Sequence, residues 1–218
     1  EGLAMAGASI VIVDLRIEKA STIAKKIKRN FGVNTYHLSA DVTDESSLKL
    51  ASKKILERYE NIDILINGAG INSPKPFLEI SLEEWHSVMN SQITGTMLGC
   101  KIFAPSMINN KKGSIINISS ASAGPPLSKA FAYSVAKAGI KNLTMNLARE
   151  WAEYNLRVNA IRPGFFPTEW NKKHFITKER EEAILNHTPM KRYGISSELI
   201  GATIWLASNA SSFVTGSE

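Results

Sequence analysis

Three side chains in the middle of the sequence have types and spacings that could move a proton. Tyr133 and Lys137 stand four residues apart, so on a helix they lie on one face. A free phenol has a pKa of about 10, and a nearby ammonium group stabilises the phenolate and lowers that pKa. The hydroxyl of Ser120 could hold a substrate oxygen while the proton moves. An isolated Tyr-x-x-x-Lys is usually a surface pair, but with Ser120 and the residues below it predicts general acid–base chemistry.

A carboxylate at the end of a short apolar run could select the nucleotide. Asp14 lies in the run over residues 9–15, and a carboxylate there can accept hydrogen bonds from both hydroxyls of an adenosine ribose. It would repel a 2′-phosphate, so it favours NAD over NADP, although Arg16 follows two residues later. The alternative is an ordinary solvated aspartate at a strand end.

Two further segments have residues suited to the same ligand. Asp41 and Val42 follow the second apolar run, where a carboxylate could accept a hydrogen bond from the exocyclic amine of adenine. The third run ends in four small or amide residues, Asn67, Gly68, Ala69 and Gly70. Small residues let the backbone approach a ribose or pyrophosphate closely, and glycine permits positive φ.

These residues fall at the ends of strands that alternate with helices. Short apolar runs rich in β-branched residues predict strands at residues 9–15, 34–39, 63–69, 114–119 and 157–161. Amphipathic segments predict helices up to about residue 30, from 44 to about 59, over 81–107 and over 130–153. This alternation implies βαβ units with right-handed crossovers.

The fold that follows is α/β, with a doubly wound, Rossmann-type parallel sheet in one domain over residues 1–218. Near-continuous apolar runs indicate strands that are covered on both faces. In such an open sheet, ligands bind outside the carboxyl ends of the strands. The residues suited to proton transfer and nucleotide binding fall at those ends, so we expect one site there.

Composition excludes several other classes of protein. The length of 218 residues, with 44% hydrophobic and 21% charged residues, suits one ordinary globular domain. No apolar run approaches 18 residues, so we expect no membrane span and no membrane partner. The net charge of +6 comes from scattered Lys and Arg, which predicts a solvated surface and no nucleic-acid partner. A basic chain still favours an anionic substrate or cofactor.

The cysteine and the histidines give no sign of a metal. Cys100 is the single cysteine, so it cannot form an internal disulfide, and we expect a reducing cytoplasm. The four histidines are His37, His86, His174 and His187. They lack the spacing of metal ligands, with one another or with Cys100, so we predict no metal site.

Taken together, the motifs resemble those of the short-chain dehydrogenase/reductase family, and the similarity spans the whole chain. The family's Asn-Asn-Ala-Gly turn matches Asn67–Gly70, and its catalytic serine matches Ser120. Its Tyr-x-x-x-Lys motif matches Tyr133 and Lys137. Its Asn-x-x-x-Pro-Gly run matches Asn159 with Pro163 and Gly164, and the threonine that follows matches Thr168. The resemblance implies hydride transfer between nicotinamide C4 and a carbinol or carbonyl carbon. It implies Tyr133 as general acid/base, Ser120 as the group that polarises the carbonyl, and Lys137 as the residue that binds ribose and tunes Tyr133.

The resemblance also implies which residues follow the last predicted strand to meet the cofactor. These are Pro163, Gly164, Phe166 and Thr168, of which Thr168 would reach the nicotinamide and the pyrophosphate. Residues of about 165–192 would form the mobile substrate lid that closes over the reaction.

Two departures from the family pattern stand out. The family normally begins with a strand and a Gly-rich turn that cradles the pyrophosphate, whereas this sequence begins at Glu1 within the following helix and ends at Glu218 before the last strand. We therefore expect a fragment of a longer chain. Gln92 stands where the family has an asparagine whose backbone anchors a relay water near the lysine. We interpret Gln92 as keeping that catalytic relay through a shifted water, and partial loss of activity is the alternative.

The lid region indicates a class of substrate. Phe165, Phe166 and Trp170 offer aromatic faces to a sugar ring, while Lys172 or Lys173 could pair with a carboxylate. Three segments resemble those of family members that act on sugar acids, such as mannonate/fructuronate or gluconate 5-dehydrogenases. These segments are the Pro-Gly-Phe-Phe run, residues 188–192 and residues 126–129. The alternative is an uncharged polyol, ketone or acyl derivative.

A rival function from a different class is a non-catalytic nucleotide-binding module, either a redox-sensing regulator or a scaffold. Gln92 and the expected absence of the Gly-rich turn favour it, whereas Ser120, Tyr133 and Lys137 argue against it. Met and Trp stripes on the two long helices suit core or subunit contacts, so we expect a homodimer or homotetramer.

Overall fold

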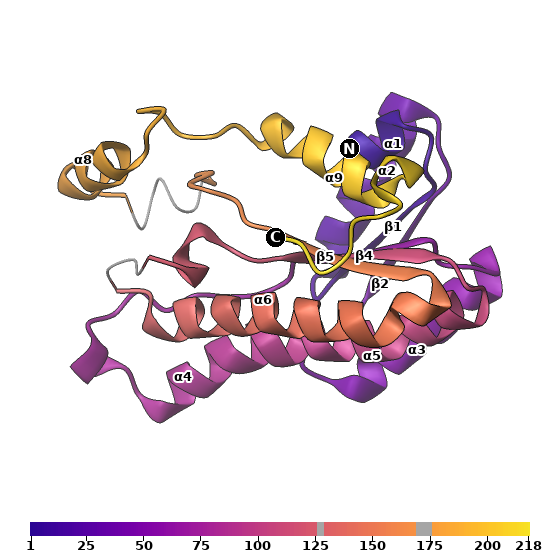
Figure 1. The fold of residues 1–218 in the computed structure, drawn as a ribbon, viewed down its shortest axis with the longest axis horizontal. Helices are drawn as coiled ribbons and strands as arrows, with labels where there is room; N and C mark the ends of the chain where they lie inside the picture. The colour runs from indigo at the N-terminus through magenta and orange to yellow at the C-terminus, as the bar shows by residue number, and fades with distance from the viewer. Residues whose placement is uncertain (126–128, 169–175) are drawn as a thin grey trace.

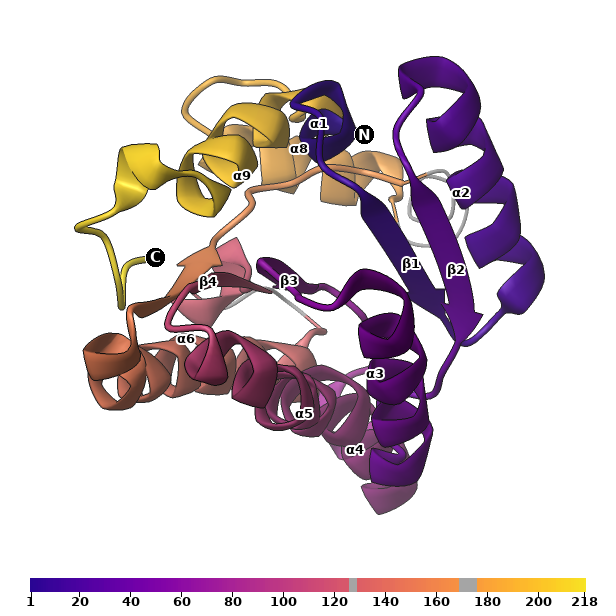
Figure 2. The same cartoon turned by 90° about the vertical axis from the view of Figure 1, so that its right-hand side faces the viewer.

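The computed structural model describes residues 1–125, 129–168 and 176–218 and contains two parallel sheets (Figures 1 and 2). The strands are β1 Ile10–Asp14, β2 Thr35–Ser39, β3 Ile64–Asn67, β4 Gly113–Ile118 and β5 Leu156–Ile161. β1 pairs with β2 in one sheet, and the other sheet has the order β3-β4-β5. All pairs are parallel, so each connection crosses over through a helix. The five predicted strands are confirmed, with ends that differ by at most two residues.

The helices of the described chain are α1 Gly2–Met5, α2 Ile17–Phe31, α3 Glu45–Tyr59, α4 Leu82–Met89, α5 Gly95–Asn109, α6 Phe131–Trp151, α8 Lys178–His187 and α9 Ile200–Ala207. The four helical segments that the periodicity predicts are confirmed as α2, α3, α4 with α5, and α6, whereas α8 and α9 were not predicted. Short 3₁₀ turns lie at η1 Phe77–Glu79, η3 Ala121–Ala123, η4 Ala152–Tyr154, η5 Ser196–Leu199 and η6 Asn209–Ser211. A π-helical turn, η2 Asn90–Thr94, joins α4 to α5. The helix predicted over residues 81–107 is therefore continuous but wider in its middle turn.

Local sequence explains where several helices begin and end. Asp44 caps α3 by accepting a hydrogen bond from the Ser46 amide at 2.8 Å. A capping box of Ser81 and Glu84 starts α4. Gly32 ends α2 with a φ of 69°, which is a left-handed conformation that glycine adopts without steric cost.

Helices cover both faces of the three-stranded sheet (Figure 1). α5 and α6 pack on one face, where Met107 and Ile115 are fully buried. α9 covers the other face, with Leu206 packed against Ile116 and Ile161. This layering places the carboxyl ends of β3, β4 and β5 at one open edge of the sheet.

The prediction that every strand is covered on both faces holds for β4 and β5 but not for β1, β2 and β3. Ile115 and Ile116 of β4 are completely buried, whereas all five residues of β1 remain partly exposed. The reason is that β1 is hydrogen-bonded to β2 alone, and it is not paired with β3. The two sheets therefore stand side by side without a shared ladder (Figure 2).

Candidate active site

The residues predicted to bind ligand lie at strand ends. Asp14 ends β1, Asn67 ends β3, and Ser120 follows β4 by two residues. Pro163 follows β5 and its carbonyl accepts a hydrogen bond from the Ala121 amide at 2.9 Å. The parallel register therefore brings the ends of β4 and β5 into direct contact.

Ser120, Tyr133 and Lys137 come together at this edge. Ser120 is the N-cap of η3, and Tyr133 and Lys137 occupy successive turns of α6. Lys137 Nζ lies 5.4 Å from the centre of the Tyr133 ring and donates a hydrogen bond of 2.6 Å to the Ile118 carbonyl. The predicted common face of Tyr133 and Lys137 is thus the observed arrangement, with the ammonium over the ring.

The direction of the Tyr133 pKa differs from the sequence prediction. Burial raises the pKa of the Tyr133 phenol, and a hydrogen bond with Ser120 only partly opposes this effect. Burial also lowers the pKa of Lys137 to about 8, because the ammonium loses hydration. The predicted lowering of the Tyr133 pKa is therefore wrong for this chain, since desolvation outweighs the hydrogen bond with Ser120.

The Ser120 hydroxyl is held by a residue that sequence reasoning missed. Its Oγ accepts hydrogen bonds from the Ser122 amide at 3.2 Å and from the Ser122 hydroxyl at 3.0 Å. Ser122 is 2% exposed. The pattern Ser-x-Ser after a predicted strand is the signal that could have found it, since the first serine can cap such a turn by accepting from the amide two residues on.

Gln92 lies inside the molecule and holds the loop that follows β3. Its side chain is buried, and Nε2 donates a hydrogen bond of 2.8 Å to the Ile71 carbonyl. Ser91 accepts a hydrogen bond of 3.2 Å from the Ile71 amide, so both peptide groups of Ile71 are bound to the π-helical turn. The backbone carbonyl of Gln92 accepts from the Thr96 hydroxyl at 2.7 Å. Gln92 Oε1 is buried without a partner among the described residues.

The glycine turn after β3 offers backbone, while the side chain of Asn67 points away from it. Asn67 donates to Asn117 Oδ1 at 2.9 Å and to the sulfur of Cys100 at 3.3 Å. Gly68, Ala69 and Gly70 are exposed. The turn therefore exposes its backbone at Ala69 and Gly70, and the contact of these residues with a nucleotide stays a prediction.

At the end of β1, Asp14 is bound to its neighbour. Its Oδ1 accepts hydrogen bonds from the Arg16 amide at 2.8 Å and from Arg16 Nε at 3.1 Å. The hydrogen bond from the Arg16 side chain holds the pKa of Asp14 below its usual value. Asp14 is thus a carboxylate at neutral pH, with an arginine beside it.

Asp41 and Val42 lie next to each other between β2 and α3. Asp41 Oδ1 accepts from the Thr43 amide at 2.8 Å and from the Thr43 hydroxyl at 2.7 Å. Val42 packs against Gly95, where an added Cβ would come within 2.9 Å of Val42 Cγ2. Both residues therefore also stabilise this turn of the fold.

The segment after β5 is open at one residue and packed at another. A Cβ added to Gly164 would meet no atom within 4 Å, so its backbone is accessible to a ligand. Phe166 packs on Gly194, and the Phe165 ring lies 5.5 Å from the Tyr193 ring. Thr168 is exposed. Residues 126–128 and 169–175, which include Trp170, Lys172, Lys173 and His174, lie outside the described residues.

The described part of the chain holds neither a candidate metal cluster nor a candidate membrane span. Within residues 1–125, 129–168 and 176–218, no group of three or more His, Cys, Asp or Glu side chains could hold a metal ion. None of the helices in this part of the chain is long and apolar enough to cross a membrane.

The fold and the site define the class of protein. A family model described as enoyl-(acyl carrier protein) reductase matches residues 1–218. The chain belongs to the short-chain dehydrogenase/reductase family, and it is an oxidoreductase that uses NAD(P) and acts on CH–OH groups.

The chain is similar to several oxidoreductases, two of which are named for a gluconate substrate. The uncharacterized oxidoreductase UxuB of Bacillus subtilis (strain 168) is 37% identical, over 98% of this chain and 84% of that protein. The 5-keto-D-gluconate 5-reductase of Escherichia coli (strain K12) is 33% identical, over 99% and 84%. The structure of a gluconate 5-dehydrogenase from Burkholderia cenocepacia J2315, in complex with NADP and tartrate, superimposes with a TM-score of 0.94 at 35% identity, over 99% and 84%. The non-catalytic alternative gains no support from these oxidoreductases.

Proposed function

We propose that this protein is a dehydrogenase of sugar acids that prefers NAD. The observation that carries the proposal is the meeting of Ser120, Tyr133 and Lys137 at the carboxyl edge of the sheet. Two of the named relatives act on gluconate derivatives, which supports a sugar acid as substrate. The net charge of +6 supports an anionic substrate as well.

The three side chains divide the work of moving one proton. In the oxidation direction, the Tyr133 oxygen accepts the proton of the substrate hydroxyl, and Ser120 donates a hydrogen bond to the same oxygen. A nicotinamide coenzyme held by the residues at the strand ends would supply the hydride acceptor, so that the substrate C–H bond could break as its C=O bond forms. Lys137 places a positive charge over the Tyr133 ring, which favours the phenolate.

The residues at the strand ends fit a dinucleotide. Asp14 presents a carboxylate at the end of β1, where it can accept hydrogen bonds from the adenosine ribose, and Asp41 and Val42 follow β2. The exposed backbone of Ala69, Gly70 and Gly164 allows close approach of the sugar and phosphate groups. Asp14 supports NAD, because a 2′-phosphate beside it would be repelled, while Arg16 reduces this repulsion.

Further residues complete the proposed site. Pro163, Phe166 and Thr168 would border the cofactor at the start of a substrate lid of about residues 165–192. Phe166 is fixed by its packing on Gly194, so the lid would be attached firmly at its base. We assign Gln92 to this site as the residue that holds the loop after the glycine turn.

We also propose that the protein forms a homodimer or homotetramer through α5 and α6. These helices border an apolar groove of about 270 Å³ that includes Met97, Pro105, Ile108, Leu147 and Trp151. Methionine and aromatic side chains are enriched at the centres of protein interfaces.

The substrate class is tested by steady-state assays of the intact protein. Aldonates, uronates and neutral polyols are each offered with NAD and with NADP, and kcat/KM is measured. We expect at least a tenfold preference for acids over polyols of equal length, and a higher kcat/KM with NAD. Equal rates on acids and polyols would contradict the sugar-acid assignment, and equal rates with both coenzymes would contradict the role of Asp14.

The catalytic assignment is tested by Tyr133→Phe. This variant lacks the proton acceptor, so we expect turnover to fall by about 10²–10⁴-fold. Coenzyme affinity, measured by quenching of tryptophan fluorescence, should stay within a few fold. Tyr154→Phe, which removes a phenol just beyond the other end of α6, is the control and should keep wild-type turnover. Unchanged turnover in Tyr133→Phe would contradict the assignment of Tyr133 as the general acid/base. A non-catalytic nucleotide-binding module would then be the better description of the protein.

A further inference from the structure

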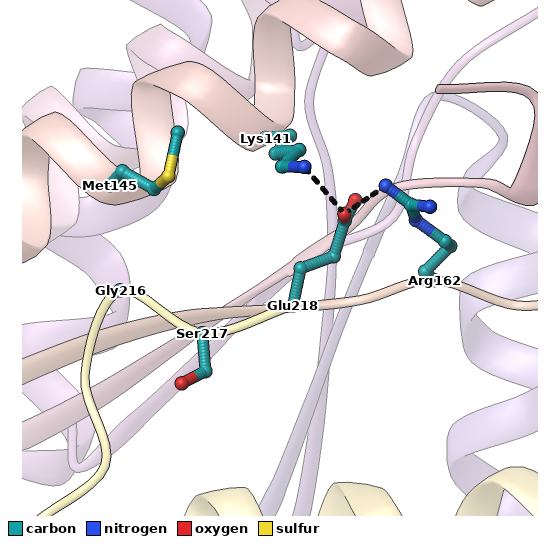
Figure 3. Close-up of a pocket in the computed structure, with 6 residues that line it drawn as sticks. All are labelled: Lys141, Met145, Arg162, Gly216, Ser217 and Glu218. Atoms are coloured by element: carbon teal, nitrogen blue, oxygen red, sulfur yellow. Dashed lines mark hydrogen bonds and ion pairs between the residues drawn. The ribbon is translucent and has the colours of Figure 1, made fainter. Parts of the chain in front are cut away.

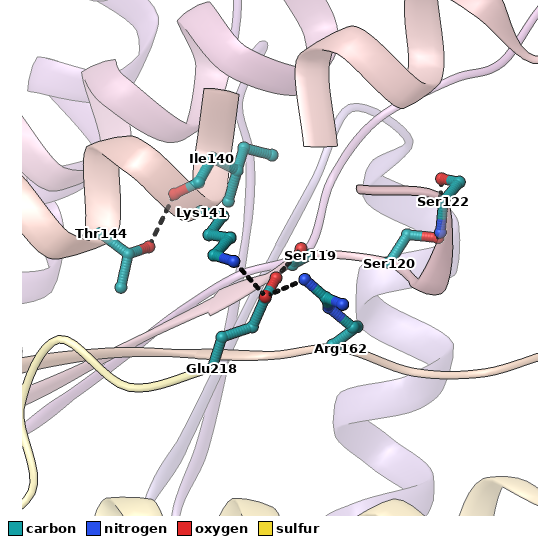
Figure 4. Close-up of polar contacts among 8 residues, drawn as sticks. All are labelled: Ser119, Ser120, Ser122, Ile140, Lys141, Thr144, Arg162 and Glu218. Carbon is teal, nitrogen blue, oxygen red and sulfur yellow. Dashed lines mark hydrogen bonds and ion pairs between the residues drawn. The ribbon is translucent and has the colours of Figure 1, made fainter. Parts of the chain in front are cut away.

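A carboxylate with little exposed side-chain surface lies behind the proposed catalytic serine. The side chain of Glu218 is 9% exposed and is surrounded by donors (Figures 3 and 4). Its Oε1 accepts a hydrogen bond of 2.5 Å from the Ser119 hydroxyl. Its Oε2 forms an ion pair with Arg162 and lies 3.6 Å from Lys141 Nζ. Three donors from three different elements therefore meet on one carboxylate.

The position of Glu218 is fixed by the segment that precedes it. The Gly216 amide donates to the Val158 carbonyl at 2.8 Å, and the Ala160 amide donates to the Ser217 carbonyl at 2.8 Å. The Asn159 side chain adds hydrogen bonds to the Val214 carbonyl and the Ser217 amide. The segment is thus bound along β5, so the Glu218 side chain has little freedom to leave its partners.

Each donor stands next to a residue of the proposed site. Ser119 immediately precedes Ser120, and Arg162 immediately precedes Pro163. Lys141 lies one helical turn after Lys137 on α6. Beyond the regular ladder, the Ser119 amide donates to the Ile161 carbonyl at 2.8 Å. Figure 4 shows that Glu218 lies between these elements, on the side of Ser119 away from Ser122.

We propose that Glu218 is a positioning residue, which ties the ends of β4 and β5 together and thereby fixes Ser120 relative to Tyr133. Glu218 does not touch the reacting atoms; it acts through Ser119 and Arg162. This inference rests on the proposed dehydrogenase function but not on the identity of the substrate. An error of about 1 Å in the placement of a catalytic group can cost as much as 10²-fold in rate.

The carboxylate is charged at neutral pH despite its burial. Burial by itself would raise the pKa of Glu218, but hydrogen bonds from Arg162 and Ser119 and the charges of Arg162 and Lys141 hold that pKa below its usual value. A neutral amide at this position would keep an acceptor for Ser119 but lose the ion pairs.

The test is Glu218→Gln in the intact protein, assayed with any substrate that the wild-type protein turns over. We expect kcat to fall about tenfold, because Ser120 is less firmly placed, while the dissociation constant for NAD stays within twofold. Glu218→Asp should recover part of the lost kcat. A fall in NAD affinity with unchanged kcat would overturn the inference.

Hydrogen exchange provides a readout that does not depend on activity. In Glu218→Gln, we expect the amides of Ser119 and Ala121 to exchange at least fivefold faster, because they join the ends of β4 and β5. The Ile116 amide, inside β4, should exchange as in the wild type. Unchanged exchange at Ser119 and Ala121 would overturn the inference even if the protein turned over no substrate, a result that would contradict the proposed function separately.

Two further variants protect the test from a folding defect. If Glu218→Gln does not fold, Ser119→Ala replaces it in the test. Ser119→Ala removes one hydrogen bond to Glu218 and keeps both ion pairs, so its kcat should fall, but by less than the fall of about tenfold expected for Glu218→Gln. Asp63→Asn is the matched control, because it removes an ion pair with Lys112 beside the opposite ends of β3 and β4. It should leave kcat and the exchange of Ser119 and Ala121 unchanged, and equal losses in this control would show an effect of stability alone.

Discussion

At the scale of single residues, burial is the dominant influence on the groups proposed to transfer the proton. Tyr133 and Lys137 are both removed from water, so the pKa of the phenol is raised and that of the ammonium is lowered to about 8. The neutral forms of both groups are favoured together. The hydrogen bond with Ser120 lowers the Tyr133 pKa but does not cancel the effect of burial.

A pH dependence of turnover follows from the raised pKa of Tyr133. Oxidation needs the phenolate, so kcat/KM for the alcohol should rise with pH above neutrality. Reduction needs the protonated phenol, so kcat/KM for the carbonyl substrate should fall over the same pH range. In Ser120→Ala, the hydrogen bond that lowers the Tyr133 pKa is lost, so the rise should move to higher pH. The pH profiles of kcat/KM in both directions check this. A profile of Ser120→Ala that rises at the same or a lower pH than the wild type would refute it.

At the scale of elements, the π-helical turn between α4 and α5 holds the loop after β3. Ser91 and Gln92 bind the two peptide groups of Ile71, and the Gln92 carboxamide lies flat against Gly70. A Cβ at Gly70 would stand 2.3 Å from Gln92 Cδ. The glycine turn and the π-helical turn therefore fit together only if residue 70 has no side chain.

Gly70→Ala tests this fit. The added methyl group must displace the Gln92 side chain, so we expect a loss of about 1–3 kcal/mol in the free energy of unfolding and lower turnover. Gly201→Ala is the matched control, because a Cβ there meets nothing within 4 Å and alanine favours the helix α9. It should leave stability equal or raised by about 0.5 kcal/mol. Urea unfolding measures both, and a Gly70→Ala protein as stable as the wild type would contradict the packing.

At the scale of the whole molecule, one apolar surface still lacks a partner within the described chain. Met97 on α5 is 37% exposed and Met145 on α6 is 41% exposed. The groove between these helices has Pro105 and Trp151 in its lining. Burial of such a surface in a second copy would remove apolar area from water, which drives association.

Met97→Glu tests the proposed oligomer. A charge in the centre of an apolar interface would be desolvated without a partner, so we expect dissociation towards the monomer. Leu50→Glu, at an exposed apolar position on α3, is the control and should leave the assembly intact. Light scattering coupled to size-exclusion chromatography gives both masses. A wild-type monomer at micromolar concentration would be the contrary result.

Local features of the structure could be predicted well from the sequence, because they depend on residues that are near neighbours in the chain. The alternation of apolar runs and amphipathic segments located all five strands and the long helices. The common face of Tyr133 and Lys137 follows from helical spacing alone. The family motifs are likewise short runs, so the class of protein was evident before any contact was known.

The tertiary structure alone decided what depends on packing between distant residues. Ser119 and Glu218 are 99 positions apart, and no local pattern joins them. The inward turn of Asn67 and the bond from Gln92 to Ile71 also arise only when strands and helices pack. Burial is a property of the folded whole, so the direction of the Tyr133 pKa could not be predicted from a lysine one turn away. Spacing determined which groups can meet, and packing determined how far water is excluded from them.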